Sequence, residues 1–280
     1  MSGISEAVVE QGLFPEELQG RVRGLPPLLK WAGGKRWLVP VLAPLWRSHA
    51  HRRWVDPFCG GLALPLALGP ERALLNDINP HLINFYRQVQ QGLRLSLPMA
   101  PERGLYEAYR KRFNELIREG KTWTQEAAQL FYYLNRTGYN GLCRFNRKGE
   151  YNVPFGRYKK VEYARDFQPY QLLMREWEFC CGDFEEVRLE SDDFLYADPP
   201  YDVEFRQYTA EGFSWEDQLR LAEWLYRHRG PVVVSGQATE RIVQLYERLG
   251  FRLRFVRGPR LISCTGDRTP AVEMIAVRNL

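Results

Sequence analysis

Short apolar runs alternate with segments of helical spacing along most of this 280-residue chain. A brief apolar run bounded by proline, glycine or acidic residues is typical of a buried strand, and apolar residues at three- and four-residue steps predict an amphipathic helix. By these rules strands are expected at 54–56, 73–77, 194–197 and 231–235. Helices are expected at 62–68, 81–90, 215–228 and 240–248, and a closing antiparallel pair at 251–256 and 272–277. The alternation predicts an α/β fold, a doubly wound and mostly parallel sheet with helices on both faces.

One long stretch interrupts this alternation. Residues 101–135 have a helical pattern, and residues 136–158 are rich in glycine, asparagine, arginine and aromatic residues. Phe145 and the segment 151–153 flank a turn-like sequence, which predicts a β-hairpin with a loop of about five residues. We therefore expect an N-terminal extension over 1–27, a main domain made of 28–100 and 166–280, and an inserted helical plus β-hairpin subdomain over 101–165.

Carboxylates follow three of the expected strands. Asp56, Asp77 and Asp198 each end a short apolar run. In open α/β sheets ligands bind just outside the carboxyl ends of the strands, so these acids are candidates for one site. An acid after the second strand is the usual partner of ribose hydroxyls, and Gly60 permits close approach of the backbone after the first. The simpler alternative is that these acids are ordinary turn residues.

The most informative motif is Asp198-Pro199-Pro200-Tyr201. It combines a carboxylate, carbonyls on a backbone restricted by proline, and an aromatic ring at a strand end. The carboxylate and a proline carbonyl can accept both N–H bonds of an exocyclic amine while the ring stacks on the base. The motif therefore predicts attack by a nucleobase amine on an electrophile. It also occurs in some RNA methyltransferases, and a plain strand-end turn is the structural alternative.

Composition narrows the class of protein. Hydrophobic residues make up 45% and charged residues 26%, which is ordinary for a soluble protein, and the net charge is +5. Seven basic residues and one acid lie between 136 and 160, which favours a polyanionic partner. The five cysteines form no CxxC pair and the four histidines no metal cluster, so we expect free thiols, no metal and a cytoplasmic location. No apolar run reaches the length of a membrane span, so no membrane partner is expected.

The turn after the first strand limits the choice of cofactor. It contains neither the G-x-G-x-x-G of a dinucleotide site nor the G-x-x-x-x-G-K-[ST] of a phosphate-binding loop. What remains suits a nucleoside without phosphates that carries a charged amino-acid end, and S-adenosyl-L-methionine has that shape. Asp77 would hold the ribose, and Asp56 would lie near the methionine end.

Four motifs occur in order at 30–35 (KWAGGK), 56–61 (DPFCGG), 76–79 (NDIN) and 198–201 (DPPY), with a long block of unusual composition at 134–158. They resemble the Dam-type DNA adenine-N6 methyltransferases, in the α arrangement of that family, over most of the chain. Segments at 212–214 and 263–268 resemble later family motifs. The resemblance implies a class I, Rossmann-like methyltransferase that uses S-adenosyl-L-methionine, and it makes 101–165 the DNA-recognition part.

The resemblance also implies roles for individual residues. The implied cofactor-binding residues are Trp31, Lys35, Asp56, Phe58, Gly60, Asp77, Ile78 and Asp198. The implied catalytic residues are Asp198, Pro199, Pro200 and Tyr201. The implied DNA-binding residues are Lys30, Arg136, Tyr139, Asn140, Leu142, Arg144, Pro154, Arg157 and Tyr158. In this set Tyr139 is the wedge in the base stack, Arg144, Leu142, Pro154 and Lys30 contact base edges, and Asn140 and Arg157 hold phosphates.

The activity expected from this resemblance is methyl transfer to N6 of a flipped-out adenine in double-stranded DNA, with GATC as the target. An RNA methyltransferase or a cytosine-N4 methyltransferase with the same cage is the main alternative. A DNA-binding regulator that kept the fold without the chemistry is a weaker one. We expect a monomer or weak dimer, and a cognate restriction endonuclease encoded nearby as a further partner if the enzyme belongs to a restriction–modification pair.

Overall fold

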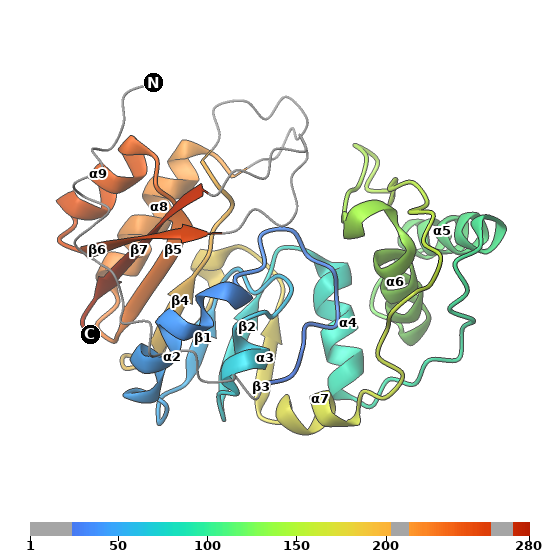
Figure 1. The fold of residues 1–280 in the computed structure, drawn as a ribbon, viewed down its shortest axis with the longest axis horizontal. Coiled ribbons are helices and arrows are strands. Elements are labelled where there is room, and N and C mark those ends of the chain that lie inside the picture. The colour runs from blue at the N-terminus through green and yellow to red at the C-terminus, as the bar shows by residue number, and fades with distance from the viewer. Residues whose placement is uncertain (1–23, 203–212, 259–270) are drawn as a thin grey trace.

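The computed structural model describes residues 24–202, 213–258 and 271–280. Within them lies a seven-stranded sheet of order β3-β2-β1-β4-β5-β7-β6 (Figure 1). Its strands are β1 (Trp54–Asp56), β2 (Ala73–Asn76), β3 (Trp177–Cys180), β4 (Phe194–Ala197), β5 (Val232–Gln237), β6 (Arg252–Gly258) and β7 (Ala271–Arg278). Residues 1–23 of the expected extension, Gly212 and the family-like segment 263–268 lie outside the described residues.

Strand direction confirms the predicted sheet. The strands β3, β2, β1, β4 and β5 pair in parallel, whereas β7 runs antiparallel between β5 and β6. The order of the strands reverses between β1 and β4, because β2 and β3 continue on one side and β5 on the other. This reversal is the topological switch point at which open α/β sheets bind their ligands.

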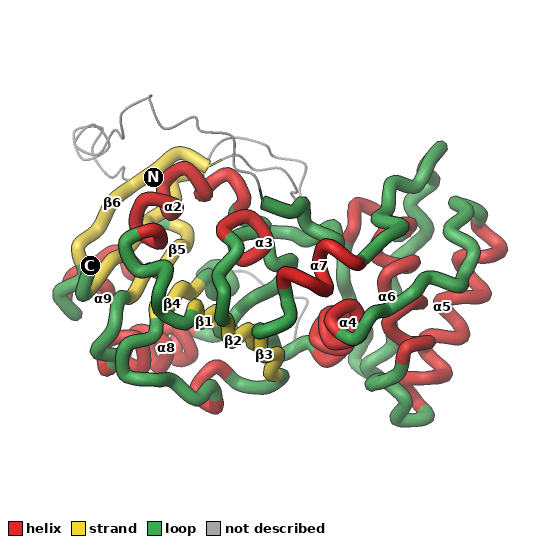
Figure 2. The backbone as a smooth tube through the Cα atoms, turned by 90° about the horizontal axis from the view of Figure 1, so that it is seen from below, coloured by secondary structure: helices red, strands yellow, loops and turns green. Residues whose placement is uncertain are grey.

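Helices cover both faces of the sheet. The α-helices of the described residues are α2 (Val39–Arg47), α3 (Pro65–Leu68), α4 (Pro80–Gln90), α5 (Arg103–Arg118), α6 (Gln125–Thr137), α7 (Gln168–Leu173), α8 (Trp215–Arg227) and α9 (Glu240–Arg248), of which α5 and α6 lie away from the sheet. Since strand side chains alternate between faces, Trp54 and Tyr196 pack on the side of α2, α3 and α4, while Val55 and Leu195 pack on the side of α8 and α9 (Figure 2). Among the described helices none is both long and apolar enough to cross a bilayer.

Two side-chain caps fix helices that border the sheet edge. Asn79 Oδ1 accepts hydrogen bonds from the backbone of His81 and Leu82, at 3.0 and 3.2 Å, so α4 begins directly behind Asp77. Ser214 and Asp217 form a reciprocal capping box at the start of α8.

Three elements are absent from the sequence-based prediction, namely α2, α7 and β3. Helix α2 carries Pro40 in its first turn and Pro44 in its interior, and these prolines obscure the helical pattern. Strand β3 has only four residues and exposes Glu178, so it lacks a continuous apolar run. Both helices and the strand are stabilised by tertiary packing that the local pattern does not encode.

The interrupting stretch forms helices α5 and α6, which lie beyond α4 at one end of the molecule (Figures 1 and 2). Buried Tyr106, Phe113 and Phe131 join them to the core that continues under α4 and the sheet. The expected hairpin is short: Phe145 and Tyr151 pair in antiparallel fashion, and backbone hydrogen bonds from Asn146 to Glu150 at 2.9 Å and from Asn152 to Arg144 at 3.1 Å flank that pair. This part of the chain therefore shares its hydrophobic core with the sheet.

Candidate active site

The sheet brings the three strand-end carboxyls to one edge. Strand β1 pairs with both β2 and β4, so Asp56 lies between Asp77, which follows β2, and Asp198, which follows β4. Burial raises the pKa of Asp198 and Asp77 and holds that of Asp56 well above its ordinary value. The negative charges of Asp198 and Asp77 add to the rise at Asp56. The site is therefore rich in buried acid.

Asp198 is anchored from two sides. Lys35 Nζ lies 2.8 Å from Oδ1 and donates a 3.0 Å hydrogen bond to Oδ2. From β5, Ser235 Oγ donates to Oδ1 at 3.0 Å, and it lies 2.6 Å from Tyr196 Oη. A serine hydroxyl has one hydrogen, so Tyr196 must be the donor to Ser235. A directed chain of hydrogen bonds thus runs from the core to the carboxylate.

Lys35 is almost fully buried and remains charged because acids surround it. Burial alone would lower the pKa of Lys35, but attraction by Asp198, Glu273 and Tyr201 outweighs that effect and raises it. The ammonium lies 4.9 Å from the centroid of the Tyr201 ring, which is a cation–π distance. The Tyr201 hydroxyl in turn donates to Glu273 Oε1.

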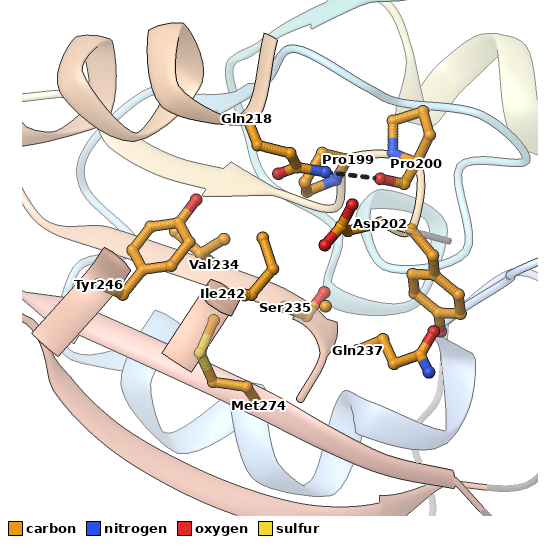
Figure 3. Close-up of a pocket in the computed structure, with 12 residues that line it drawn as sticks. Pro199, Pro200, Asp202, Gln218, Val234, Ser235, Gln237, Ile242, Tyr246 and Met274 are labelled. Carbon is orange, nitrogen blue, oxygen red and sulfur yellow. Dashed lines mark hydrogen bonds between the residues drawn. The ribbon is translucent and has the colours of Figure 1, made fainter. Parts of the chain in front are cut away.

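The proline carbonyls of the motif differ in their partners. Gln218 Nε2 donates to the Pro200 carbonyl at 2.9 Å, as the close-up of the neighbouring pocket shows (Figure 3). Among the described residues, no hydrogen bond is made to the carbonyl of Pro199. Within the part of the chain that the structure describes, the Pro199 carbonyl therefore keeps both lone pairs for a ligand, whereas the Pro200 carbonyl keeps one.

The glycines after β1 accommodate Trp31. A Cβ atom added at Gly60 would lie 2.7 Å from Trp31 Nε1, and one added at Gly61 would lie 2.7 Å from Trp31 Cβ. Gly60 also has φ of +43°, which disfavours other residues. In this structure, therefore, the side chain of Trp31 packs closely against the backbone of these two glycines.

The residues around Asp77 form a partly apolar surface. Asp77 accepts backbone hydrogen bonds from Gly60 at 3.1 Å and Asn79 at 2.9 Å. The next residue, Ile78, is 77% exposed, which is unusual for a large apolar side chain beside a buried acid. Phe58 is half-buried and meets the Phe213 ring edge-on at 5.5 Å. These groups offer apolar contact beside an acid.

Although Lys30 directly precedes Trp31, its contacts are with the inserted stretch 101–165 and not with the turn after β1. Its backbone exchanges two 2.8 Å hydrogen bonds with the Asn135 side chain, and its Nζ donates to the Arg136 carbonyl at 3.1 Å. The ammonium lies 3.7 Å from the centroid of the Tyr158 ring. A Cβ added at Gly141 would lie 2.2 Å from Lys30 Cβ, so glycine is required there. Burial, with repulsion from Arg136, lowers the pKa of Lys30 to about 8.

The remaining residues assigned to DNA contact divide into two groups. The first group is exposed to solvent. It consists of Tyr139, which is 50% exposed, and of Asn140, Arg144, Pro154 and Arg157. The guanidinium of Arg144 is held by Asn152, at 2.8 Å to Oδ1 and 3.3 Å to the carbonyl. By contrast Arg136 donates to the carbonyls of Glu162 and Leu28, and Leu142 and Tyr158 are partly buried. Arg136 therefore stabilises the chain around Lys30 in this structure.

Sequence reasoning missed Ser235 and Glu273. Ser235 ends a run of three valines and its side chain is fully buried, so a polar residue there was the available signal. Glu273 is a 4% exposed acid in a strand of buried apolar residues. An acid in such a strand is uncommon unless a partner or function requires it.

The chain matches the model of the D12 class N6 adenine-specific DNA methyltransferases over residues 31–256, and it belongs to that family. The expected enzyme class, a DNA methyltransferase specific for adenine, is thereby confirmed.

Relatives of this chain have names of the same kind. It is 35% identical over 265 residues to the Retron Ec67 DNA adenine methylase of Escherichia coli, which covers 89% of this chain and 90% of that protein. It is 35% identical over 272 residues to the DNA adenine methylase of Vibrio cholerae, with 89% and 94% covered. It is 33% identical over 275 residues to the Type II methyltransferase M.MjaIII of Methanocaldococcus jannaschii, with 86% and 94% covered.

Ser235→Ala is expected to slow methyl transfer about tenfold, because a hydrogen bond to a charged group contributes about 1.5–3 kcal/mol and Asp198 loses one of its two anchors. Single-turnover methylation of a DNA duplex measures this. Ser48→Ala, which removes an exposed hydroxyl near Pro44, is the matched control. A wild-type rate in Ser235→Ala would show that Lys35 alone fixes the carboxylate.

Proposed function

We propose that this protein transfers a methyl group from S-adenosyl-L-methionine to N6 of a flipped-out adenine in duplex DNA, with GATC as the site. The observation that carries the proposal is the largely buried carboxylate of Asp198, fixed by Lys35 and Ser235 at the switch point of the sheet and followed by the Tyr201 ring. Family membership supplies adenine and DNA as the acceptor. The donor, the target sequence and the role of each residue are what the proposal adds.

The buried acids fit a cationic, phosphate-free cofactor. Among the described residues the strand-end acids of the site are Asp56, Asp77 and Asp198, and Lys35 is the basic group paired with Asp198. Mutual repulsion among the acids would be relieved by a ligand bearing positive charge, and S-adenosyl-L-methionine carries a sulfonium and an ammonium group. When bound, it supplies an electrophilic methyl group. Lys35 would meet its carboxylate, and Trp31, Phe58 and Ile78 would flank the nucleoside.

The cage residues would act on the adenine amine. Asp198 and the Pro199 carbonyl accept its two N–H bonds, which turns the nitrogen lone pair toward the electrophile. Tyr201 stacks on the base, and the backbone of Pro200 is held in place by Gln218. Most of the rate acceleration would come from orientation and fixed charge, because no covalent intermediate is needed.

We further propose that residues 101–165 form the DNA-recognition part, with 28–100 and 166–280 as the catalytic domain. The exposed residues Tyr139, Arg144 and Arg157 gather on this part, beside Lys30. Tyr139 would fill the gap left by the flipped base, and the Arg144 fork suits the major-groove edge of guanine. Because two relatives are named Type II methyltransferases, the proposal also includes a partner endonuclease.

The test is methyl transfer from labelled S-adenosyl-L-methionine to matched duplexes containing one GATC or one GTTC, with product nucleosides identified by mass. We expect N6-methyladenine only from the GATC duplex, and no product from Asp198→Ala. Methylation of both duplexes would keep the chemistry and overturn the proposed target. N4-methylcytosine would support the alternative acceptor, and transfer to RNA alone would overturn the proposal.

Arg144→Ala is expected to lower discrimination rather than chemistry. A good bidentate base contact contributes about 1–3 kcal/mol, so the preference for GATC over a site changed at one guanine should fall about tenfold or more. The single-turnover rate at saturating DNA should change less than about threefold. Arg147→Ala, an exposed arginine in the same hairpin, should weaken every duplex equally. Equal losses on cognate and altered sites in Arg144→Ala would contradict base readout.

DNA affinity is expected to fall with rising pH because of Lys30. Its pKa in the free protein is about 8, so the side chain is charged below that pH and neutral above it. DNA phosphates favour the charged form, so binding at pH 9 must take up a proton and the dissociation constant should rise by up to about tenfold between pH 7.5 and 9. Fluorescence anisotropy at constant ionic strength measures this. Lys30→Gln should flatten the profile, and an unchanged slope in that variant would exclude Lys30 as the titrating group.

A further inference from the structure

The carboxylate of Glu273 is a buried group that the proposed chemistry leaves without a role. Glu273 is 4% exposed and lies in β7, where it is opposite Gln237 of β5 and Val256 of β6. The four residues that follow it in the strand are buried and apolar. A buried carboxylate costs several kcal/mol unless its oxygens are satisfied. A buried glutamate in this strand therefore indicates that its carboxylate has a specific role.

The two oxygens of Glu273 have different environments. Oε1 accepts the hydrogen bond from the Tyr201 hydroxyl, whereas Oε2 is buried and has no hydrogen-bond partner among residues 24–202, 213–258 and 271–280. Room for the side chain is made by Gly258 in β6, because a Cβ there would lie 3.1 Å from Glu273 Cγ. The same added Cβ would lie 2.5 Å from Trp37, so a larger residue would displace the wall around the carboxylate.

Stacking on a base does not require the hydroxyl of Tyr201, since a phenyl ring offers the same π face. In this structure the hydroxyl ties the far end of the ring to β7, and the Lys35 ammonium lies 4.9 Å from the ring centroid. Lys35 also binds Asp198. The ring is thus held at its tip by Glu273 and at its face by the residue that fixes the catalytic carboxylate.

We propose that Glu273 is a positioning residue for methyl transfer, which holds Tyr201 by its hydroxyl and so sets the ring plane against which the flipped adenine stacks beside Asp198. This inference rests on the proposed function. It assigns the Tyr201 hydroxyl a task that depends wholly on Glu273. Removal of either group should then free the ring to rotate, with the same consequence for the amine that Asp198 has to hold.

The test is a double-mutant cycle in the full-length protein with Glu273→Leu and Tyr201→Phe. Each single variant is expected to lower the single-turnover rate about tenfold or more, and the double variant should be no slower than either. Glu273→Gln keeps an acceptor for the hydroxyl and should retain most of the rate. Affinities for cofactor and DNA should change less than about threefold, which separates positioning from binding. The matched control is Glu247→Leu, an exposed acid on α9.

A spectroscopic readout completes the test. With 2-aminopurine at the target position, the flipped base should be quenched by the ring in the wild type and brighter in Glu273→Leu and Tyr201→Phe alike. A wild-type rate in Tyr201→Phe would overturn the inference even if Glu273→Leu fails to fold. If Glu273→Leu folds, losses that multiply in the double variant would overturn it as well. A wild-type protein that methylates no duplex would instead sink the proposed function, whatever the variants do.

Discussion

The ion pair between Lys35 and Asp198 is the interaction on which the site depends. A carboxylate largely buried at the end of β4 would be costly and would tend to protonate, and a protonated acid is a weaker acceptor for an N–H of the amine. Lys35 offsets that cost, because its Nζ lies 2.8 Å from Asp198 Oδ1. It begins the short helical turn before α2 and is far from Asp198 in sequence. Ser235 from β5 and Glu273 from β7 complete the surroundings. Four separate segments of the chain must therefore be in place before the two carboxylate oxygens of Asp198 are positioned for catalysis.

Two adjacent residues connect the halves of the molecule. Trp31 packs on the Gly60-Gly61 turn, whereas Lys30 is joined by reciprocal hydrogen bonds to Asn135 at the end of α6. The segment between them is one peptide bond long, so it leaves little freedom between the proposed cofactor turn and the proposed DNA-reading block. The glycine at 141 lets Lys30 approach that block as closely as Gly60 lets Trp31 approach the turn. Glycines at these positions thus serve contact between protein segments.

The sequence pattern predicted the sheet well because its central strands are short, apolar and closed by acids or prolines. β4 was predicted at its observed bounds, and the caps of α4 and α8 have clear sequence signatures. Edge strand β3 and the proline-containing α2 depend on neighbours that no local pattern reveals. The same limit applies to the site. Asp198 could be found from its motif, but Ser235 and Glu273 matter only because β5 and β7 place them beside it.

The N-terminus of α4 also links the proposed cofactor site to the proposed DNA-reading block. Asn79 donates from its backbone to Asp77 and from its side chain to Cys143 Sγ at 3.5 Å, so one residue contacts both the proposed ribose-binding acid and the neighbour of Arg144. Two residues on, burial lowers the pKa of His81 to about 4, and its neutral ring stacks on Phe145 at 4.9 Å. A shift of the loop after β2 would therefore move the hairpin with it. Since the hairpin shares its core with the sheet, the placement of a nucleoside and the placement of a base-reading arginine are set by the same rigid support.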